Sequence, residues 1–377
     1  MKFGIFYEMQ LPKPWGPTSE LDIFQQSLDQ VELADELGYD YVWEVEHHFL
    51  EEYSHSSAPE IFLAAASQRT QRIRLGHGIV LMPQAYNHPA RTAERIATLD
   101  LISNGRVDFG TGESSSEMEM GAFGVKREEK REQWEESLRC LVGMFRDEPW
   151  EFHGKYIDFP KRNVIPKPMQ KPHPPLWVAC SNPDTVYMAA KYGLGTLGFD
   201  FSGPDETAKR RAEYYRIIRE ECDPIGDAIN AQYAVVSGFM CCPRDEEAVE
   251  KGLPGMAFFG YALSHYYAGN KHEPGNTDLM DAFTSATRVG SDGSASGCIG
   301  SPKTIRARLL ALEEAGVDQV IFVAPAGATK HQDIMSSLRL FASELLPEFK
   351  ERDKAHQKRR LEWLGEAAPK EPVAAGS

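Results

Sequence analysis

The sequence of 377 residues has little of what usually marks membrane or secreted proteins. No apolar run approaches the roughly 20 residues that a helix needs to span a bilayer, and no apolar leader segment opens the chain. Its 6 cysteines are scattered, without C-x-x-C spacing, in a chain too long to need disulfide staples. We therefore expect a cytoplasmic protein with reduced thiols and no membrane contact.

Positive charge is also in short supply, with 41 Lys and Arg residues against 56 Asp and Glu residues and a formal net charge of -15. Short basic runs lie at 126–131 and 350–360. This balance argues against nucleic acid or an anionic membrane as the main partner. It does not indicate a substrate, because an acidic surface also simply favours solubility.

Several catalytic motifs are missing. There is no G-x-S-x-G, no Walker A sequence and no C-x-x-C pair, so hydrolase, nucleoside-triphosphatase and thiol-redox functions have no motif support. The segment from Gly193 to Gly198 matches G-x-G-x-x-G only formally. It follows a predicted helix and opens a predicted strand, whereas a dinucleotide-binding loop follows a strand and opens a helix.

What the sequence does contain is a regular alternation of short apolar strands and amphipathic helices. In the first helix, Leu21, Phe24, Leu28 and Val31 recur at spacings of three or four residues, and Gly38 ends the helix. Eight such units predict parallel strands with right-handed crossovers, in the α/β class, closed into a (β/α)8 TIM barrel with insertions after strands 4 and 7. The predicted strands are 2–7, 41–45, 73–82, 106–111, 176–180, 194–199, 232–241 and 319–323; the predicted helices are 20–37, 59–70, 89–103, 128–147, 183–192, 204–222, 302–315 and 331–346; a hairpin is predicted at 150–159.

Residues 1–350 are predicted to form this barrel as a single domain. The larger insertion, 253–300, mixes aromatic residues with a Gly/Ser-rich stretch from Gly290 to Gly300, and we expect it to act as a lid. The tail, 351–377, is charged and then of low complexity. We expect it to lie outside the core and to be partly disordered.

The second predicted strand ends in Glu46, His47 and His48. In a (β/α)8 barrel the active site lies at the carboxyl ends of the strands. Successive strand residues point to opposite faces, so adjacent histidines cannot easily share one metal ion, and no H-E-x-x-H is present. We predict no metal site. From the residues alone, the pair is either a hydrogen-bonded core feature or an acid/base site.

Two other strand ends are suited to an anion. Gly110 to Ser116 is a Gly-rich loop followed by serines, and Ser181 to Thr185 opens a helix with residues that cap helix N-termini. Backbone N–H groups at such a helix start bind phosphate. Ser181 is therefore either a phosphate contact or a plain helix cap, and the sequence leaves both open.

Blocks along about residues 1–350 resemble bacterial luciferase and its relatives. The resemblance implies a homodimeric two-component monooxygenase whose barrel binds flavin at the carboxyl face. Reduced FMN would come from a separate NAD(P)H:flavin reductase, and the C4a-(hydro)peroxyflavin formed with O2 would oxygenate an organic substrate. Aromatic residues in the predicted lid favour a small apolar or aromatic substrate. The blocks are Met1–Gly4, Gly38–Phe49, Leu75–Pro83, His88–Pro89, Ala93–Glu94, Leu99–Asp100, Ser103–Arg106, Phe109–Gly112, Trp177–Ser181, Gly300–Thr304 and Ser337–Pro347.

The resemblance also implies residue roles. His47 matches the family histidine that sits beside the flavin in acid/base or peroxyflavin-stabilising roles, with His48 as its supporting neighbour. Gly78 and Ile79 match a pair whose peptide bond is often a non-prolyl cis bond against the isoalloxazine ring, a form that costs ~3 kcal/mol. The other expected cofactor-binding residues lie in the loop after strand 4 and at the phosphate-binding helix start: Thr111, Glu113, Ser114, Ser115, Ser181 and Thr185.

The chain departs from bacterial luciferase at one informative place. Gly112 and Glu113 stand where luciferase has a reactive cysteine and a phosphate-binding arginine. A carboxylate cannot replace a guanidinium at a phosphate. The phosphate must therefore rely on backbone N–H groups and hydroxyls, or on a cation from elsewhere, and luciferase-like light emission on an aldehyde is not expected.

Two alternatives stay open beside the monooxygenase. One is a deazaflavin (F420)-dependent enzyme that transfers hydride on the same barrel without O2; the other is a non-catalytic flavin-binding subunit. The histidine pair and the luciferase-like blocks favour the monooxygenase. For that function we expect the predicted lid to exclude water from the barrel mouth and so to limit loss of hydrogen peroxide.

Overall fold

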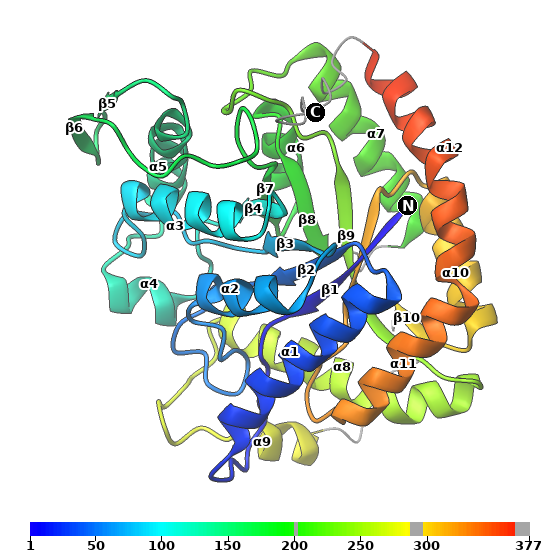
Figure 1. Cartoon of the computed structure of the whole chain (residues 1–377). Helices are drawn as coiled ribbons and strands as arrows, with labels where there is room; N and C mark the ends of the chain where they lie inside the picture. Colours follow the sequence, from blue (N-terminus) through cyan, green and yellow to red (C-terminus); the bar gives the residue numbers. More distant parts are fainter. Residues whose placement is uncertain (200–202, 287–296, 366–377) are drawn as a thin grey trace.

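The computed structural model describes residues 1–199, 203–286 and 297–365, and it has the predicted (β/α)8 architecture. Eight parallel strands lie in the order β9-β11-β1-β2-β3-β4-β7-β8, and pairing of β8 with β9 closes the barrel. Figure 1 shows the helices surrounding these strands. The barrel strands are β1 (Lys2–Tyr7), β2 (Tyr41–Glu44), β3 (Arg74–His77), β4 (Val107–Thr111), β7 (Leu176–Cys180), β8 (Gly195–Phe199), β9 (Tyr233–Cys241) and β11 (Gln319–Val323).

The outer helices bury their apolar faces against the strands, as the helical spacing predicts. The first of them ends at Gly38, whose φ of 89° is left-handed backbone that glycine adopts without strain. These helices are α1 (Ser19–Leu37), α2 (Pro59–Arg69), α3 (Pro89–Ile102), α5 (Lys130–Met144), α6 (Pro183–Lys191), α7 (Pro204–Glu220), α10 (Pro302–Glu314), α11 (His331–Glu344) and α12 (Leu346–Leu364).

Two tryptophans fill the barrel interior below the carboxyl ends of the strands. Trp43 and Trp177 are fully buried, and their rings meet edge to face with centroids 5.2 Å apart. A Cβ atom at Gly76 would lie 2.2 Å from the Trp43 ring, so only glycine leaves room for it. The indole N–H of Trp177 donates to Asp108 at 2.9 Å, which satisfies both buried polar groups. This plug gives the carboxyl end of the barrel a rigid floor.

The insertion after β4 contains α4 (Glu117–Phe123), α5 and a two-stranded hairpin of β5 (Trp150–His153) and β6 (Asp158–Arg162). The strands of the hairpin pair antiparallel, which confirms the hairpin predicted around Gly154. The helix α4 begins at Ser116, whose hydroxyl accepts the N–H of Met118 at 3.2 Å. Through α4 this insertion reaches the carboxyl face of the barrel.

The insertion after β9 is more regular than the sequence suggested. A long helix, α8 (Asp245–Tyr267), begins before the predicted boundary at 253, and α9 (Leu279–Ala286) follows it. α8 buries Phe258 and Phe259 in one cluster with the barrel-interior tryptophans, so it covers the carboxyl end of the barrel. The predicted loop ending at Gly300 closes in a short strand, β10 (Cys298–Gly300), that pairs with β9. The part of that loop at 287–296 lies outside the described residues.

The prediction that the chain leaves the core after residue 350 is wrong for residues 351–364. They belong to α12, which runs along one side of the molecule (Figure 1). His356 is 1% exposed, and its Nε2 lies 3.0 Å from Oδ1 of the buried Asp318. The N-terminal ammonium donates to Asp353 at 2.6 Å. Asp353 and His356 are thus buried here because each has a partner, at the N-terminus or just before β11; residues 366–377 lie outside the described part.

Two general features complete the fold. All six cysteines are free thiols, and five of them are buried. Among the helices of the described ranges, none combines the length and the apolar character that a bilayer crossing requires.

Candidate functional site

A cavity of about 310 Å³ opens at the carboxyl ends of the barrel strands. Its volume lies at the lower end of the range typical of small-molecule sites. Most of its wall is apolar, with Phe6, Ile79, Leu197, Phe199, Val236 and Leu263 among the lining residues. Of the residues predicted from the sequence, the cavity brings together His47, Gly78, Ile79, Glu113, Ser114, Ser115, Ser181 and Thr185.

His47 is the cationic group of the cavity wall. Its side chain is 4% exposed, and it follows β2 at the point where the chain leaves the barrel. Its Nδ1 lies 3.0 Å from Oε1 of Glu119, and its Nε2 lies 3.6 Å from Oε2 of Glu8. Burial lowers the pKa of His47, but the carboxylates of Glu119 and Glu8 outweigh it and raise the pKa to about 9.

Glu8 and Glu119 are site residues that the sequence did not single out. Glu8 follows β1 and lines the cavity, where its Oε1 accepts the phenol O–H of Tyr53 at 2.9 Å. Burial raises the pKa of Glu8 to about 6, although the nearby His47 and the Tyr53 hydrogen bond oppose that rise. Glu119, in α4, is fully buried and also accepts the backbone N–H of His48 at 2.9 Å. The sequence offered a signal for Glu8 alone, which is its position at the end of a predicted strand. Glu119 lies in an insertion, where the barrel pattern predicts no site residue.

His48 lies outside the cavity lining, unlike its neighbour. Its Nε2 is 3.0 Å from Oε1 of Glu46, and its ring packs against Tyr86 and Phe123. Glu46 in turn accepts the backbone N–H of Leu81 at 2.8 Å. His48 therefore ties the strand end to the β3 side of the barrel.

The bond between Gly78 and Ile79 is trans, which corrects the expectation of a cis bond. In the described residues, every cis peptide bond precedes a proline. The backbone on both sides continues the sheet: Gly78 N–H donates to Glu44 O at 2.7 Å and Val80 N–H to Gly110 O at 2.9 Å. Both hydrogen bonds form with a trans peptide bond, so the ~3 kcal/mol cost of a non-prolyl cis bond does not arise. Both residues still line the cavity as predicted.

The loop after β4 meets the cavity through Glu113, Ser114 and Ser115, but not through Thr111. Thr111 is fully buried, and its hydroxyl donates to Trp177 O at 3.1 Å while accepting the indole N–H of Trp134 at 3.0 Å. Its polar group is thus used inside the core. The expectation of a flavin contact at Thr111 does not match this position.

Two basic residues of α5 donate hydrogen bonds to this loop. Arg131 donates to both carboxylate oxygens of Glu113, at 2.8 and 3.3 Å. Lys130 donates its ammonium to the carbonyl of Ser114. Ser114 itself has a φ of 67°, a left-handed conformation that a non-glycine residue adopts only when its surroundings hold it. The carboxylate of Glu113 is therefore paired with a guanidinium of α5.

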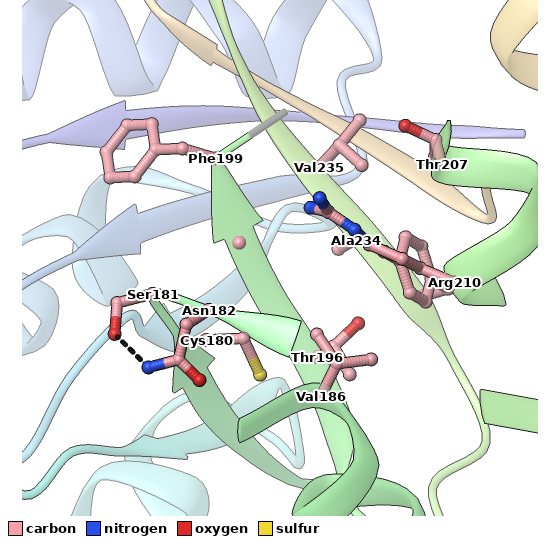
Figure 2. Close-up of a pocket in the computed structure, with 12 residues that line it drawn as sticks. Cys180, Ser181, Asn182, Val186, Thr196, Phe199, Thr207, Arg210, Ala234 and Val235 are labelled. Carbon is pink, nitrogen blue, oxygen red and sulfur yellow. Dashed lines mark hydrogen bonds between the residues drawn. The ribbon is translucent and has the colours of Figure 1, made fainter. Parts of the chain in front are cut away.

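After β7, Asn182 rather than Ser181 caps the helix α6. The Asn182 carbonyl oxygen accepts the backbone N–H of Thr185 at 3.1 Å and its hydroxyl at 3.1 Å. Figure 2 shows the Ser181 hydroxyl beside the Asn182 amide, which donates to it at 3.4 Å. The plain-cap interpretation of Ser181 is therefore wrong, because its hydroxyl is not used by the helix backbone. Ser181 lines the main cavity.

A second, smaller cavity of about 40 Å³ lies on the other side of Ser181, between β8 and α7. Figure 2 shows Thr196, Thr207 and Arg210 around it. Arg210 pairs with Glu206 one turn earlier on α7. In the described parts of the chain, no group of three or more His, Cys, Asp or Glu side chains is arranged to hold a metal ion.

The structure is that of a (β/α)8 barrel protein with a small-molecule cavity at the carboxyl ends of its strands. Comparison with known proteins identifies its family. The chain belongs to the family of luciferase-like monooxygenases, whose family model matches residues 1–319. The oxygenase component of flavin-dependent trigonelline monooxygenase from Acinetobacter baylyi is 23% identical over 356 residues, which cover 93% of this chain and 96% of that protein. An uncharacterized protein, y4wF, from Sinorhizobium fredii is 30% identical over 245 residues, which cover 65% of this chain and 64% of that protein.

Solved structures confirm the fold. The monooxygenase RslO1 from Streptomyces bottropensis superposes with a TM-score of 0.76 at 27% identity, covering 93% of this chain and 100% of that one. The oxygenating constituent of 3,6-diketocamphane monooxygenase from Pseudomonas putida, a type II Baeyer-Villiger enzyme in complex with FMN, gives 0.72 at 22% identity over 92% and 98%. Coenzyme F420-dependent tetrahydromethanopterin reductase from Methanopyrus kandleri gives 0.67 at 22% over 92% and 99%.

Proposed function

We propose that the protein is the oxygenase component of a two-component monooxygenase, which takes reduced FMN from a separate NAD(P)H:flavin reductase and oxygenates a small apolar or aromatic substrate with O2. The observation that carries the proposal is the composition of the main cavity. The lining of this apolar chamber includes His47, which faces two carboxylates, and three serines, Ser114, Ser115 and Ser181. The relative from Acinetobacter baylyi, named as an oxygenase component, supports the separate reductase.

The residues present fit FMN. An isoalloxazine ring needs a flat apolar wall, and Ile79 and Leu197 supply apolar surface next to the glycine at position 78. A ribityl phosphate needs donors, and the Ser181 hydroxyl and the start of α6 lie at the same cavity. When bound, reduced FMN supplies the electrons that activate O2.

We further propose that Arg131 supplies the positive charge that bacterial luciferase takes from its arginine. Arg131 uses two of its five N–H donors on Glu113, which leaves donors for a phosphate beside them. Lys130 lies next to it on α5 and faces the same loop. Glu113 then acts as a holder for Arg131 rather than as a phosphate contact.

The chain's own groups have distinct tasks in this proposal. Apolar side chains hold the organic substrate and exclude water, which strengthens the interactions of any charge inside. α8 covers the barrel mouth with Phe258 and Phe259. His47 offers its cavity-side nitrogen to an oxygen that gains negative charge.

The experiment is oxygen consumption by the protein with FMN, NADH and a flavin reductase, measured with and without a panel of apolar and aromatic compounds. The proposal expects substrate-dependent uptake of O2 and one oxygen atom in the product. If no compound gives an oxygenated product, while reduced F420 supports turnover without O2, the function is the deazaflavin-dependent one. Flavin binding with neither activity indicates a non-catalytic subunit.

The F420-dependent alternative is kept because the fold is shared with F420-dependent reductase, at a TM-score of 0.67. Nothing in the cavity requires it. A homodimer in the cytoplasm remains part of the proposal, and sedimentation of the purified protein tests the dimer.

A further inference from the structure

Two buried carboxylates from different parts of the chain face the two ring nitrogens of His47. Glu119 lies 3.0 Å from Nδ1, which commits that nitrogen to a hydrogen bond. Glu8 lies 3.6 Å from Nε2, which is too far for a hydrogen bond and close enough for an ion pair. Nε2 therefore stays available to a molecule in the cavity that His47 lines.

Glu8 is held in place from its other side. Its Oε1 accepts the phenol of Tyr53 at 2.9 Å, and its backbone carbonyl accepts the hydroxyl of Ser54 at 2.7 Å. Its Oε2 has no hydrogen-bond partner among the described residues. A buried carboxylate in that condition is costly unless a cation lies beside it, and the imidazolium of His47 is such a cation.

We propose that Glu8 is a positioning residue that keeps the cavity-side nitrogen of His47 protonated, so that His47 acts as a proton donor and not as a base. The proposal rests on the proposed function, because the acceptor is the oxygen that oxygenation leaves with negative charge. In the step, the Nε2–H bond of His47 breaks and an O–H bond forms on the ligand. The imidazolium becomes neutral imidazole, Glu8 keeps its charge, and no electrons are exchanged.

The other ionisable groups near the ring do not reverse this arrangement. Burial raises the pKa of Tyr53 and of Tyr267, on α8, well above the usual range, so both phenols stay neutral. Burial also raises the pKa of Glu44 on β2, which therefore adds less negative charge. Glu46, after β2, adds a weaker attraction for the proton of His47. The imidazole of His48, the adjacent residue, contacts Glu46, and only the backbone N–H of His48 bonds to Glu119.

The test is a titration of the full-length protein labelled with 15N-histidine and free of flavin, with His47 assigned from a His47→Gln variant. We expect the His47 resonances of the wild type to remain those of an imidazolium past about pH 8, and Glu8→Gln to lower the midpoint by at least about one pH unit. Glu60→Gln, which removes a carboxylate paired with Arg95 outside the main cavity, should leave the midpoint unchanged.

Tyr53→Phe gives a second variant that leaves the carboxyl group of Glu8 in place but removes a hydrogen bond that lowers its pKa, so we expect it to lower the His47 midpoint by less than Glu8→Gln does. A wild-type His47 that is neutral at pH 7, or equal midpoints in wild type and Glu8→Gln, overturns the proposal. Circular dichroism confirms the fold of each variant, and the wild-type midpoint decides the question even if Glu8→Gln does not fold. This titration uses no flavin and so does not depend on oxygenation. If His47 proves to be protonated but the protein oxygenates nothing, only the proposed function is contradicted.

Discussion

Nδ1 of His47 lies 3.0 Å from Oε1 of Glu119, and the two residues are 72 positions apart in the chain. Glu119 belongs to α4 in the insertion after β4, whereas His47 follows β2. The contact fixes the ring orientation and directs Nε2 to the Glu8 side of the cavity. An insertion outside the barrel repeat thus orients the histidine that the repeat places at the active face.

Replacement of His47 by alanine should separate cofactor binding from coupling. The phosphate and ring contacts that we propose for FMN lie on elements other than β2, so the variant should bind FMN with an affinity within about threefold of the wild type, roughly 0.6 kcal/mol. Without the proton donor, more of the NADH consumed should appear as hydrogen peroxide. The measurement is peroxide released per NADH in the reductase-coupled assay. His153→Ala, at an exposed hairpin residue, serves as control, and unchanged coupling in His47→Ala would count against its role.

Arg131→Gln should weaken FMN binding about tenfold, which corresponds to ~1.4 kcal/mol and is the size of one hydrogen bond to a charged group. Calorimetric titration with FMN at low and high salt measures it, and the loss should shrink as salt rises. Arg139→Gln, which breaks a surface pair with Glu135 on the same helix, should bind like the wild type. Equal affinities for Arg131→Gln and the wild type would exclude a phosphate contact.

Glu52 anchors α9 to the rest of the barrel mouth. It is fully buried and accepts the backbone N–H groups of Leu279, Met280 and Lys13. In Glu52→Gln an amide NH2 group faces these backbone N–H donors and cannot accept their hydrogen bonds. We therefore expect α9 to be held less firmly, with faster hydrogen exchange over 278–286 and more peroxide release. Asp281→Asn, at an exposed residue of the same helix, is the matched control. If exchange over this segment is the same in both variants, Glu52 is not the anchor.

His77 predicts a loss of stability in acid. Burial lowers its pKa to about 4, so it is neutral in the folded state and ionises more easily when unfolded. Neutral His77 makes its full contribution to the free energy of unfolding above pH 6.5. As the pH falls from 6.5 through 4, the protein loses roughly 3 kcal/mol of this free energy. Urea unfolding of His77→Leu should show a shallower fall over this range. The exposed His153→Leu should keep the wild-type fall, and a His77→Leu protein with the same fall would contradict the assignment.

The strand and helix pattern made most of the barrel predictable, because apolar periodicity and parallel connections determine which ends meet. That pattern placed His47 and Ser181 at one face, and the family resemblance added Gly78. Glu8 and Glu119 were not predictable in the same way, since their importance comes from contacts across long sequence separations. The prediction for the tail was wrong because its high charge density hid the buried partner of His356. The role of Ser181 stayed open in the sequence because the helix cap depends on which of two adjacent side-chain oxygens faces the helix.

The proposal that the protein oxygenates a substrate with reduced FMN is tested by following oxygen atoms from 18O2 into the product. The protein is mixed with reduced FMN under 18O2 in the presence of the substrate panel, and in parallel with reduced F420, and the products are analysed by mass spectrometry. We expect one 18O atom in a product formed with FMN and no product with F420. Products that carry no 18O and appear only with reduced F420 would contradict it.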